Sequence, residues 1–214
     1  MSAPRGNPGS GRSGPGSIRI IGGRWRGTRL AVADAPGLRP TSDRVRETLF
    51  NWLAPMLSGA RVLDLFAGSG ALGLEAVSRG AGEALLVERD PALAQSLRQT
   101  GERLQAAHAV QVIQADALRW LRMPVHGRFD LVLLDPPFDA ALWRDALALL
   151  PPWLAEDAWL YLESPVAADV VPGMGWSLHR EARTRDTRYA VYRRGAAATV
   201  TLPADSIAHG AATE

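Results

Sequence analysis

The segment Val62-Leu-Asp-Leu-Phe-Ala-Gly-Ser-Gly-Ala-Leu-Gly73 joins an apolar run to a glycine-rich turn. Gly68, Gly70 and Gly73 have the G-x-G-x-x-G spacing that occurs between a strand and a helix. Glycines at such a turn let the backbone approach a ligand, and the N-terminus of the following helix offers free amides. Turns of this kind also use glycine for steric reasons alone, so the spacing predicts a strand, a turn and a helix more firmly than it predicts a ligand.

Strand and helix patterns alternate from this segment onward. Apolar runs predict strands over 61–66, 84–88, 110–113, 129–134 and 159–163, and periodic segments predict helices over 71–78, 91–105 and 142–150. Two adjacent segments near the end, 176–183 and 187–193, predict an antiparallel hairpin. The alternation therefore predicts an α/β fold, a doubly wound, seven-stranded Rossmann-like sheet whose last strand is antiparallel.

A different pattern precedes this alternation. Residues 18–30 alternate in polarity and turn at Gly22-Gly23, which predicts a short β-hairpin. Thr41 or Ser42 can cap a helix that runs to Leu53. One side of this helix is expected to be charged and the other apolar, with Asp43, Arg46 and Glu47 on the first and Val45, Leu49 and Trp52 on the second.

The composition is that of a globular protein, with 47% apolar and 21% charged residues in 214. No apolar run is long enough to cross a membrane, and the N-terminus does not have the pattern of a secretory signal. The chain has no cysteine, which excludes thiolate metal sites, and its four histidines are too scattered to predict a metal site. All 24 basic residues are arginine, which suits bidentate phosphate contacts, and nine of them lie within residues 5–46.

The segment Leu131-Val-Leu-Leu-Asp-Pro-Pro-Phe138 is an apolar strand that stops at an acid, two prolines and an aromatic ring. Its unbroken apolar run is typical of a central strand, so Asp135 is expected at the ligand edge of the sheet. The prolines stiffen the loop because each fixes φ. Asp135 and the Pro136 carbonyl can accept hydrogen bonds from the amino group of a flat heterocycle, while Phe138 stacks on the ring of that heterocycle. The alternative is an ordinary proline turn at a strand end.

Three more acids indicate the cofactor side of such a site. Glu88 closes the next strand about twenty residues after the glycines, the spacing of an acid that binds ribose hydroxyls. Asp116 follows the third strand and could contact the amino edge of adenine, or could simply cap a helix. These features fit a dinucleotide or S-adenosylmethionine. Asp64 favours the second, because a carboxylate can pair with a methionine ammonium but has no use beside a pyrophosphate.

Five blocks carry a family resemblance: Arg19-Ile-Ile-Gly-Gly-Arg-Trp-Arg-Gly27, Gly37-Leu-Arg-Pro-Thr-Ser-Asp-Arg-Val-Arg-Glu-Thr-Leu-Phe-Asn-Trp-Leu53, Asp64-Leu-Phe-Ala-Gly-Ser-Gly-Ala-Leu-Gly-Leu-Glu75, Asp135-Pro-Pro-Phe138 and Trp176-Ser-Leu-His-Arg-Glu181. Over residues 18–194 the chain resembles the bacterial 16S rRNA guanine-N2 methyltransferase family, a class I S-adenosylmethionine-dependent group. The resemblance implies S-adenosylmethionine as cofactor and methylation of the exocyclic N2 of guanine 966. It also implies 16S rRNA as partner, within the small ribosomal subunit or its assembly intermediate, in the cytoplasm, with neither membrane nor metal.

Composition, local patterns and the resemblance together predict the organisation of the chain. We expect a disordered basic tail over 1–17, an RNA-binding hairpin and helix over 18–55, a methyltransferase domain over 56–194 and a flexible tail over 195–214. The predicted catalytic residues are Asp135, Pro136 and Phe138. The predicted cofactor-binding residues are Asp64, Phe66, Gly68, Gly70, Gly73, Glu88, Asp116, Ala117, Thr41 and Arg46, and the predicted RNA-binding residues are Arg19, Arg24, Trp25, Arg26, Arg29 and Arg39.

Three other functions remain open from the sequence. An adenine-N6 methyltransferase would use the same Asp-Pro-Pro loop. An NAD-dependent oxidoreductase would account for the glycines and Glu88 but not for Asp64 or Asp135. A non-catalytic RNA-binding module would need only the arginines of the N-terminal hairpin.

Overall fold

The computed structural model describes residues 17–31 and 42–195. Residues 1–16 and 196–214 of the predicted tails, and also Arg39 and Thr41, lie outside the described residues. The boundary of the first tail is wrong, because Ser17 already pairs with Ala31 in the N-terminal hairpin. The division into domains stays a prediction.

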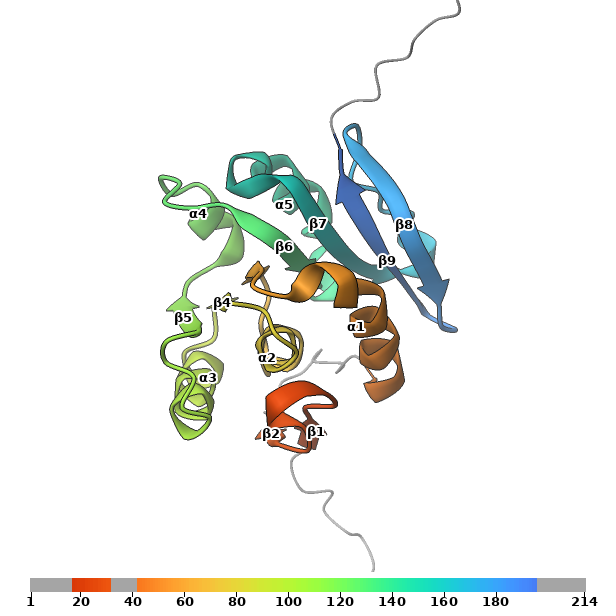
Figure 1. Cartoon of the computed structure of the whole chain (residues 1–214). Coiled ribbons are helices and arrows are strands. Elements are labelled where there is room, and N and C mark those ends of the chain that lie inside the picture. The colour runs from red at the N-terminus through yellow and green to blue at the C-terminus, as the bar shows by residue number, and fades with distance from the viewer. Residues whose placement is uncertain (1–16, 32–41, 196–214) are drawn as a thin grey trace, which may run out of the picture.

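A seven-stranded sheet forms the centre of the molecule (Figure 1). Its strands are β3 (Arg61–Asp64), β4 (Glu83–Glu88), β5 (Val110–Gln114), β6 (Phe129–Leu134), β7 (Leu154–Pro165), β8 (Trp176–Arg183) and β9 (Thr187–Arg194). They lie in the order β5-β4-β3-β6-β7-β9-β8. Strands β3 to β7 pair in parallel, whereas β9 runs antiparallel to both of its neighbours. The predicted α/β sheet with an antiparallel last strand is confirmed.

Helices cover both faces of this sheet, because the central strand is apolar on both sides. In β6, Leu131 and Leu133 pack into the cluster formed with α1 (Asp43–Leu57), α2 (Ala71–Ser78) and α3 (Pro91–Arg103). Val132 and Leu134 face the opposite cluster, which includes α4 (Ala117–Leu121) and α5 (Trp143–Leu149). All four side chains are fully buried, as the unbroken apolar run predicts. Short 3₁₀ turns lie at Gly23–Trp25, Phe138–Ala140, Pro151–Trp153 and Val166–Ala168.

The N-terminal hairpin packs against α2 on the side away from the sheet (Figure 1). Its strands β1 (Ser17–Arg19) and β2 (Arg29–Ala31) are antiparallel, and Ile20 and Leu30 are buried in the same cluster as α1 and α2. Gly23 has φ +74°, and a Cβ there would lie 1.8 Å from the Ser78 carbonyl oxygen. The predicted turn therefore requires glycine for conformation and for its close approach to α2.

Several elements differ from the prediction. Strand β3 ends at Asp64 rather than residue 66, and α3 ends at Arg103 rather than residue 105. Helix α1 continues past Leu53 to Leu57 although Pro55 removes one backbone hydrogen bond, and the buried Leu53 and Leu57 pack this last turn into the core. Strand β7 begins at Leu154 rather than Trp159, since the exposed Glu156 and Asp157 interrupt the apolar pattern of its first half. Helix α4 was not predicted, because five residues are too few to show a helical period.

Candidate active site

Four acidic side chains gather at the carboxyl edge of the parallel strands. Asp64 ends β3 and Glu88 ends β4, while Asp135 follows β6 and Glu163 lies near the end of β7. The pleat alternates side chains between the two faces, and each of these acids falls on the face covered by α1 and α2. The acids predicted to be functional, Asp64, Glu88 and Asp135, are thus brought to one edge and one face.

Asp64 is the most enclosed of these acids. Its carboxylate is 2% exposed and accepts a hydrogen bond from the Gly73 amide at 2.9 Å. Burial raises the pKa of Asp64 from 3.8 to about 7; the Gly73 hydrogen bond opposes this rise, and the nearby Glu88 charge adds to it. Gly73 leaves room for the carboxylate, because a Cβ there would lie 2.2 Å from Leu86 Cδ2 and 3.0 Å from Asp64 Oδ2.

The glycine-rich loop is held to the end of β4. Gly68 and Gly70 have φ of +53° and +76°, a conformation that favours glycine. The Gly68 amide donates to Glu88 Oε2 at 2.8 Å, and the Asp90 amide donates to Oε1 at the same distance. Glu88 is therefore fixed beside the glycine loop, where an acid that binds ribose hydroxyls is expected.

Three other predicted cofactor residues lie at the start of α4 and just after β3. Asp116 is exposed and caps α4 by accepting the Arg119 amide at 2.9 Å, which is the alternative role that the sequence left open. Ala117 is buried as the first residue of α4. Phe66 is half-buried against the cluster on the α4 and α5 face. Contact between adenine and Asp116 stays a prediction.

The Asp-Pro-Pro-Phe loop leaves the sheet directly after β6. Asp135 is half-buried and Pro136 is buried. Phe138 begins a 3₁₀ turn, and its ring lies 5.9 Å from the ring of Trp143 at 47°. One side of the Phe138 ring is therefore supported by the α5 side of the core.

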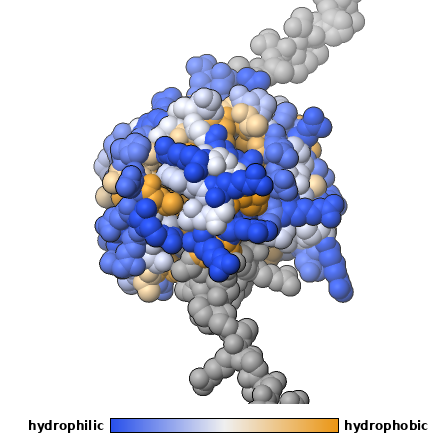
Figure 2. All heavy atoms as spheres, turned by 60° about the horizontal axis from the view of Figure 1, so that its bottom comes forward, coloured by the Kyte–Doolittle hydropathy of each residue, from blue (hydrophilic) through white to orange (hydrophobic). Residues whose placement is uncertain are grey.

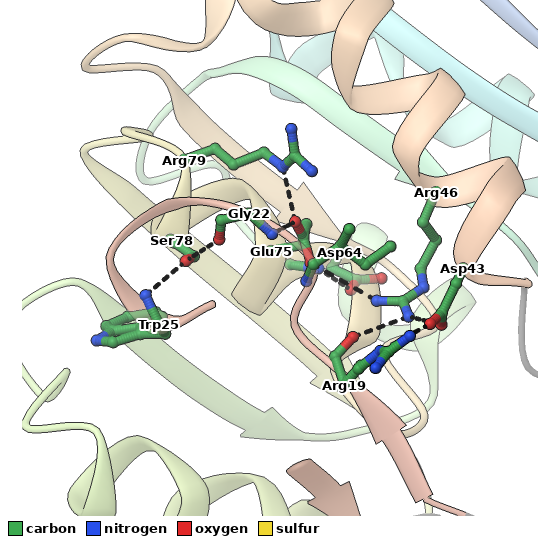
Figure 3. A network of polar contacts seen from close by, with 11 residues as sticks. Arg19, Gly22, Trp25, Asp43, Arg46, Asp64, Glu75, Ser78 and Arg79 are labelled. Atoms are coloured by element: carbon green, nitrogen blue, oxygen red, sulfur yellow. Dashed lines mark hydrogen bonds and ion pairs between the residues drawn. The ribbon is translucent and has the colours of Figure 1, made fainter. Parts of the chain in front are cut away.

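The sequence did not indicate the residue that attaches the N-terminal extension. The fully buried Glu75 of α2 accepts the amides of Ile21 and Gly22, both at 2.7 Å, and the Arg79 Nε at 2.6 Å (Figure 3). Ser78 adds two bonds one turn later, donating to the Gly22 carbonyl at 2.6 Å and accepting the Trp25 amide at 3.0 Å. A glutamate in an apolar helix, directly after a glycine motif, was the available signal.

The expected position of Arg46 is wrong. The helical pattern placed it on the charged side with Asp43 and Glu47, but its side chain is fully buried. Its Nη2 donates to Asp43 Oδ1 at 2.7 Å and to the Arg19 carbonyl at 2.9 Å, and its Nη1 lies 3.6 Å from Glu75 Oε2 (Figure 3). The reason is tertiary: the hairpin and α2 close over this side of α1.

The predicted RNA-binding arginines of the hairpin are exposed. Arg24, Arg26 and Arg29 all face solvent, and Arg24 lies 4.3 Å over the ring of Trp25. Trp25 itself is half-buried against the core, while the exposed Arg19 pairs with Asp43 at 3.1 Å. Strongly hydrophilic side chains predominate on the side of the molecule that Figure 2 shows.

Two further observations concern metal sites and membrane spans. Within the described residues, no three acidic or histidine side chains gather so that they could hold a metal ion. None of the helices in residues 17–31 and 42–195 combines the length and apolar character needed to cross a membrane.

The strand order excludes an ordinary dinucleotide sheet. That fold has six parallel strands, whereas here the antiparallel β9 stands between β7 and β8. The yhhF protein of Escherichia coli has a solved structure with a TM-score of 0.78 and 44% identity, over 84% of this chain and 99% of that one. The solved structure of the HI0767 protein of Haemophilus influenzae matches with a TM-score of 0.73 and 37% identity, over 85% of this chain and 100% of that one. Fold and site define a Rossmann-like methyltransferase.

Sequence comparison identifies the family. The profile of the family described as Conserved hypothetical protein 95 matches residues 18–193. The ribosomal RNA small subunit methyltransferase D of Escherichia coli (strain K12) is 49% identical over 188 residues, which are 86% of this chain and 93% of that protein. The protein of the same name in Haemophilus influenzae is 40% identical over 182 residues, which are 83% of this chain and 94% of that protein. The chain belongs to the family of these ribosomal RNA small subunit methyltransferases D, and the resemblance found in the sequence is confirmed.

Replacing Glu75 with alanine should destabilise the protein by about 3–5 kcal/mol, since it leaves two amides and a buried arginine without their acceptor. Urea unfolding measures this loss, and limited proteolysis should show cleavage within the hairpin at lower protease concentration. Glu83→Ala is the matched control, because Glu83 forms an exposed ion pair with Arg61. The side chains of Glu83 and Arg61 are 48% and 44% exposed, so this pair should contribute about 1 kcal/mol or less to stability. Equal effects of the two substitutions would contradict the anchoring role of Glu75.

Proposed function

We propose that this protein transfers a methyl group from S-adenosylmethionine to the exocyclic N2 of guanine 966 in 16S rRNA. The observation that carries the proposal is the placement of Asp135, the first residue of the Asp135-Pro-Pro-Phe138 loop, at the same sheet edge and face as Asp64 and Glu88. The relatives named ribosomal RNA small subunit methyltransferase D support rRNA of the small subunit as the substrate. The guanine and its position follow from the resemblance of the sequence blocks.

The residues at the glycine loop fit S-adenosylmethionine. The buried Asp64 carboxylate would pair with the methionine ammonium, and Glu88 would accept the ribose hydroxyls. Gly68 and Gly70 give the loop its positive φ angles, and Gly73 leaves room for the Asp64 carboxylate. The bound cofactor supplies an electrophilic methyl group. The proposed cofactor set also includes Phe66, Asp116, Ala117 and Thr41. Arg46 belongs to this set as a positioning residue, because it holds the hairpin and α2 together through the Arg19 carbonyl and Glu75.

The Asp-Pro-Pro-Phe loop would orient the acceptor. The lone pair of the guanine amino group is delocalised into the ring, so its orientation is the main difficulty of the reaction. Asp135 and the Pro136 carbonyl would accept the two amino hydrogens, while Phe138, supported by Trp143, would hold the plane of the ring. After transfer the surplus proton leaves the amine for water. The target base must be unstacked, which favours an unpaired nucleotide.

The hairpin would bind the RNA backbone. Exposed Arg24, Arg26 and Arg29 suit phosphate contacts, together with Arg19, Trp25 and Arg39 of the predicted set. The proposed target lies in the small ribosomal subunit or an assembly intermediate, which places the enzyme in the cytoplasm. An adenine-N6 methyltransferase is the remaining alternative, because its chemistry needs the same Asp-Pro-Pro loop.

Asp135→Ala should lower the rate of methyl transfer by about 100-fold or more, because the amine is no longer oriented. Asp135→Asn keeps an acceptor oxygen and should retain more activity than alanine. Single-turnover transfer to 16S rRNA, followed by mapping of the methylated nucleotide, measures both. Asp157→Ala, 79% exposed on β7, is the control and should match the parent. Equal, complete loss in both Asp135 variants would indicate an essential base instead, and methylation of adenine would overturn the substrate.

The affinity for S-adenosylmethionine should fall as the pH decreases below about 7, where Asp64 becomes protonated. The sign follows from the raised pKa: only the carboxylate, which forms above that pKa, pairs with an ammonium. Calorimetric titration between about pH 5 and pH 8 measures the effect, with Kd rising about tenfold for each unit well below the pKa. Asp64→Asn should bind more weakly and lose this dependence. Parallel pH profiles of parent and variant would exclude Asp64 from ammonium binding.

Replacing both Arg24 and Arg26 with alanine should weaken RNA binding and flatten its dependence on salt, by about one unit of slope for each phosphate that the variant no longer neutralises. Fluorescence anisotropy at several salt concentrations measures the slope. The double variant Arg122→Ala and Arg144→Ala removes two exposed arginines from the α4 and α5 face and should leave the slope unchanged. Equal slopes in the two double variants would mean that the hairpin is not the RNA-binding surface.

A further inference from the structure

A second carboxylate lies beside Asp135. The parallel register of β6 and β7 ends with Leu134 opposite Leu162, so Asp135 and Glu163 are the next residues on neighbouring strands. Both fall on the face covered by α1 and α2, because Leu133 and Tyr161, two residues earlier, belong to that cluster. Glu163 is 7% exposed. The target edge of the site therefore presents two adjacent acids, of which the function proposed above uses one.

Glu163 is held in a defined orientation. The Tyr161 hydroxyl donates to Glu163 Oε2 at 2.6 Å, and the Trp143 Nε1 donates to the Glu163 carbonyl at 2.7 Å. Tyr161 is fully buried, and its pKa is raised well above the usual value by burial, by the charge of Glu163 and by that of Asp135. The hydroxyl thus remains a donor and fixes the carboxylate, while the indole fixes the backbone.

Aromatic side chains border the same acid. Tyr189 of β9 is paired with Glu163, and its ring stacks on Trp52 of α1 at 5.6 Å and 21°. Glu163 is thus hydrogen-bonded to one tyrosine and paired across the strands with a second, whose ring is itself stacked. Such a carboxylate is prepared to accept a hydrogen bond from a ligand at the sheet edge without first reorganising.

Guanine carries two neighbouring donors on one edge, the N1–H and the N2 amino group. Adenine differs, because its N1 is an acceptor with a lone pair that a carboxylate repels. From these contacts we infer that Glu163 accepts the N1–H of the target guanine while Asp135 holds its amino group, so that Glu163 makes the site specific for guanine. This inference rests on the proposed function.

The test compares two RNA fragments that differ only at the target, guanine in one and 2-aminopurine in the other. 2-Aminopurine keeps the 2-amino group, but its N1 accepts a hydrogen bond instead of donating one. The parent should prefer guanine in kcat/KM. In Glu163→Gln, the amide NH₂ can donate to N1 of 2-aminopurine, so the preference should fall by about tenfold or more. Glu156→Gln, an exposed glutamate on the same strand, is the matched control and should keep the parent preference.

A merely structural role for Glu163 would lower transfer to both fragments equally, and an unchanged preference would overturn the inference. If Glu163→Gln does not fold, Tyr161→Phe gives the second measurement, because it removes only the hydroxyl that orients the carboxylate. The preference for guanine should fall in that variant too, and a parent-like value would again overturn the inference. A parent enzyme that methylates neither fragment nor intact 16S rRNA would instead refute the proposed function itself.

Discussion

The position of the N-terminal extension depends on one buried carboxylate, that of Glu75. It accepts two consecutive backbone amides of the hairpin and pairs with Arg46 of α1 and with Arg79, the residue that follows α2. A buried charge is costly unless it is fully hydrogen-bonded, so the hairpin, α1 and α2 stabilise the carboxylate as much as it anchors them. Glu75 lies two residues after Gly73 on α2, so the same helix holds the hairpin through Glu75 and contacts Asp64 through the Gly73 amide.

The pleat of the parallel strands places the rest of the site. Register between β3, β4, β6 and β7 brings four acids from different parts of the chain to one edge, and alternation turns them to one face. Burying these acids disfavours their charged form, and at Asp64 it raises the pKa to about 7. A ligand that brings a cation or N–H donors to such an edge offsets the burial of the acids. The site therefore suits an ammonium group and an amino-bearing base.

The two halves of this edge differ in how their acids are held. Asp64 and Glu88 accept backbone amides from the glycine loop and its neighbour, which suits groups that position a cofactor. Glu163 is instead held by the side chain of Tyr161 and through its own backbone by Trp143. Side-chain donors of this kind come from the core, so the target side of the site depends on the packing of β7 against α5.

The sequence by itself determined the fold class and most of the candidate site. Apolar runs, turn residues and the strand-glycine-helix order depend on local chemistry, so β6, β8 and α2 were predicted with their observed bounds. Asp64, Glu88 and Asp135 could be placed because each ends a strand that is readable in the sequence. Their functions stay predictions.

Only the tertiary structure decided the burial and the partners of Arg46, Glu75 and Glu163. A helical pattern assigns a charged residue to the solvent side, and it cannot show that Arg19 of the hairpin contacts Asp43, 24 residues later, and Arg46, 27 residues later. Glu163 neighbours Asp135 through strand register, a contact between residues far apart in the chain. Local patterns follow the period of one element, whereas the burial and pairing of a charge depend on which elements pack together.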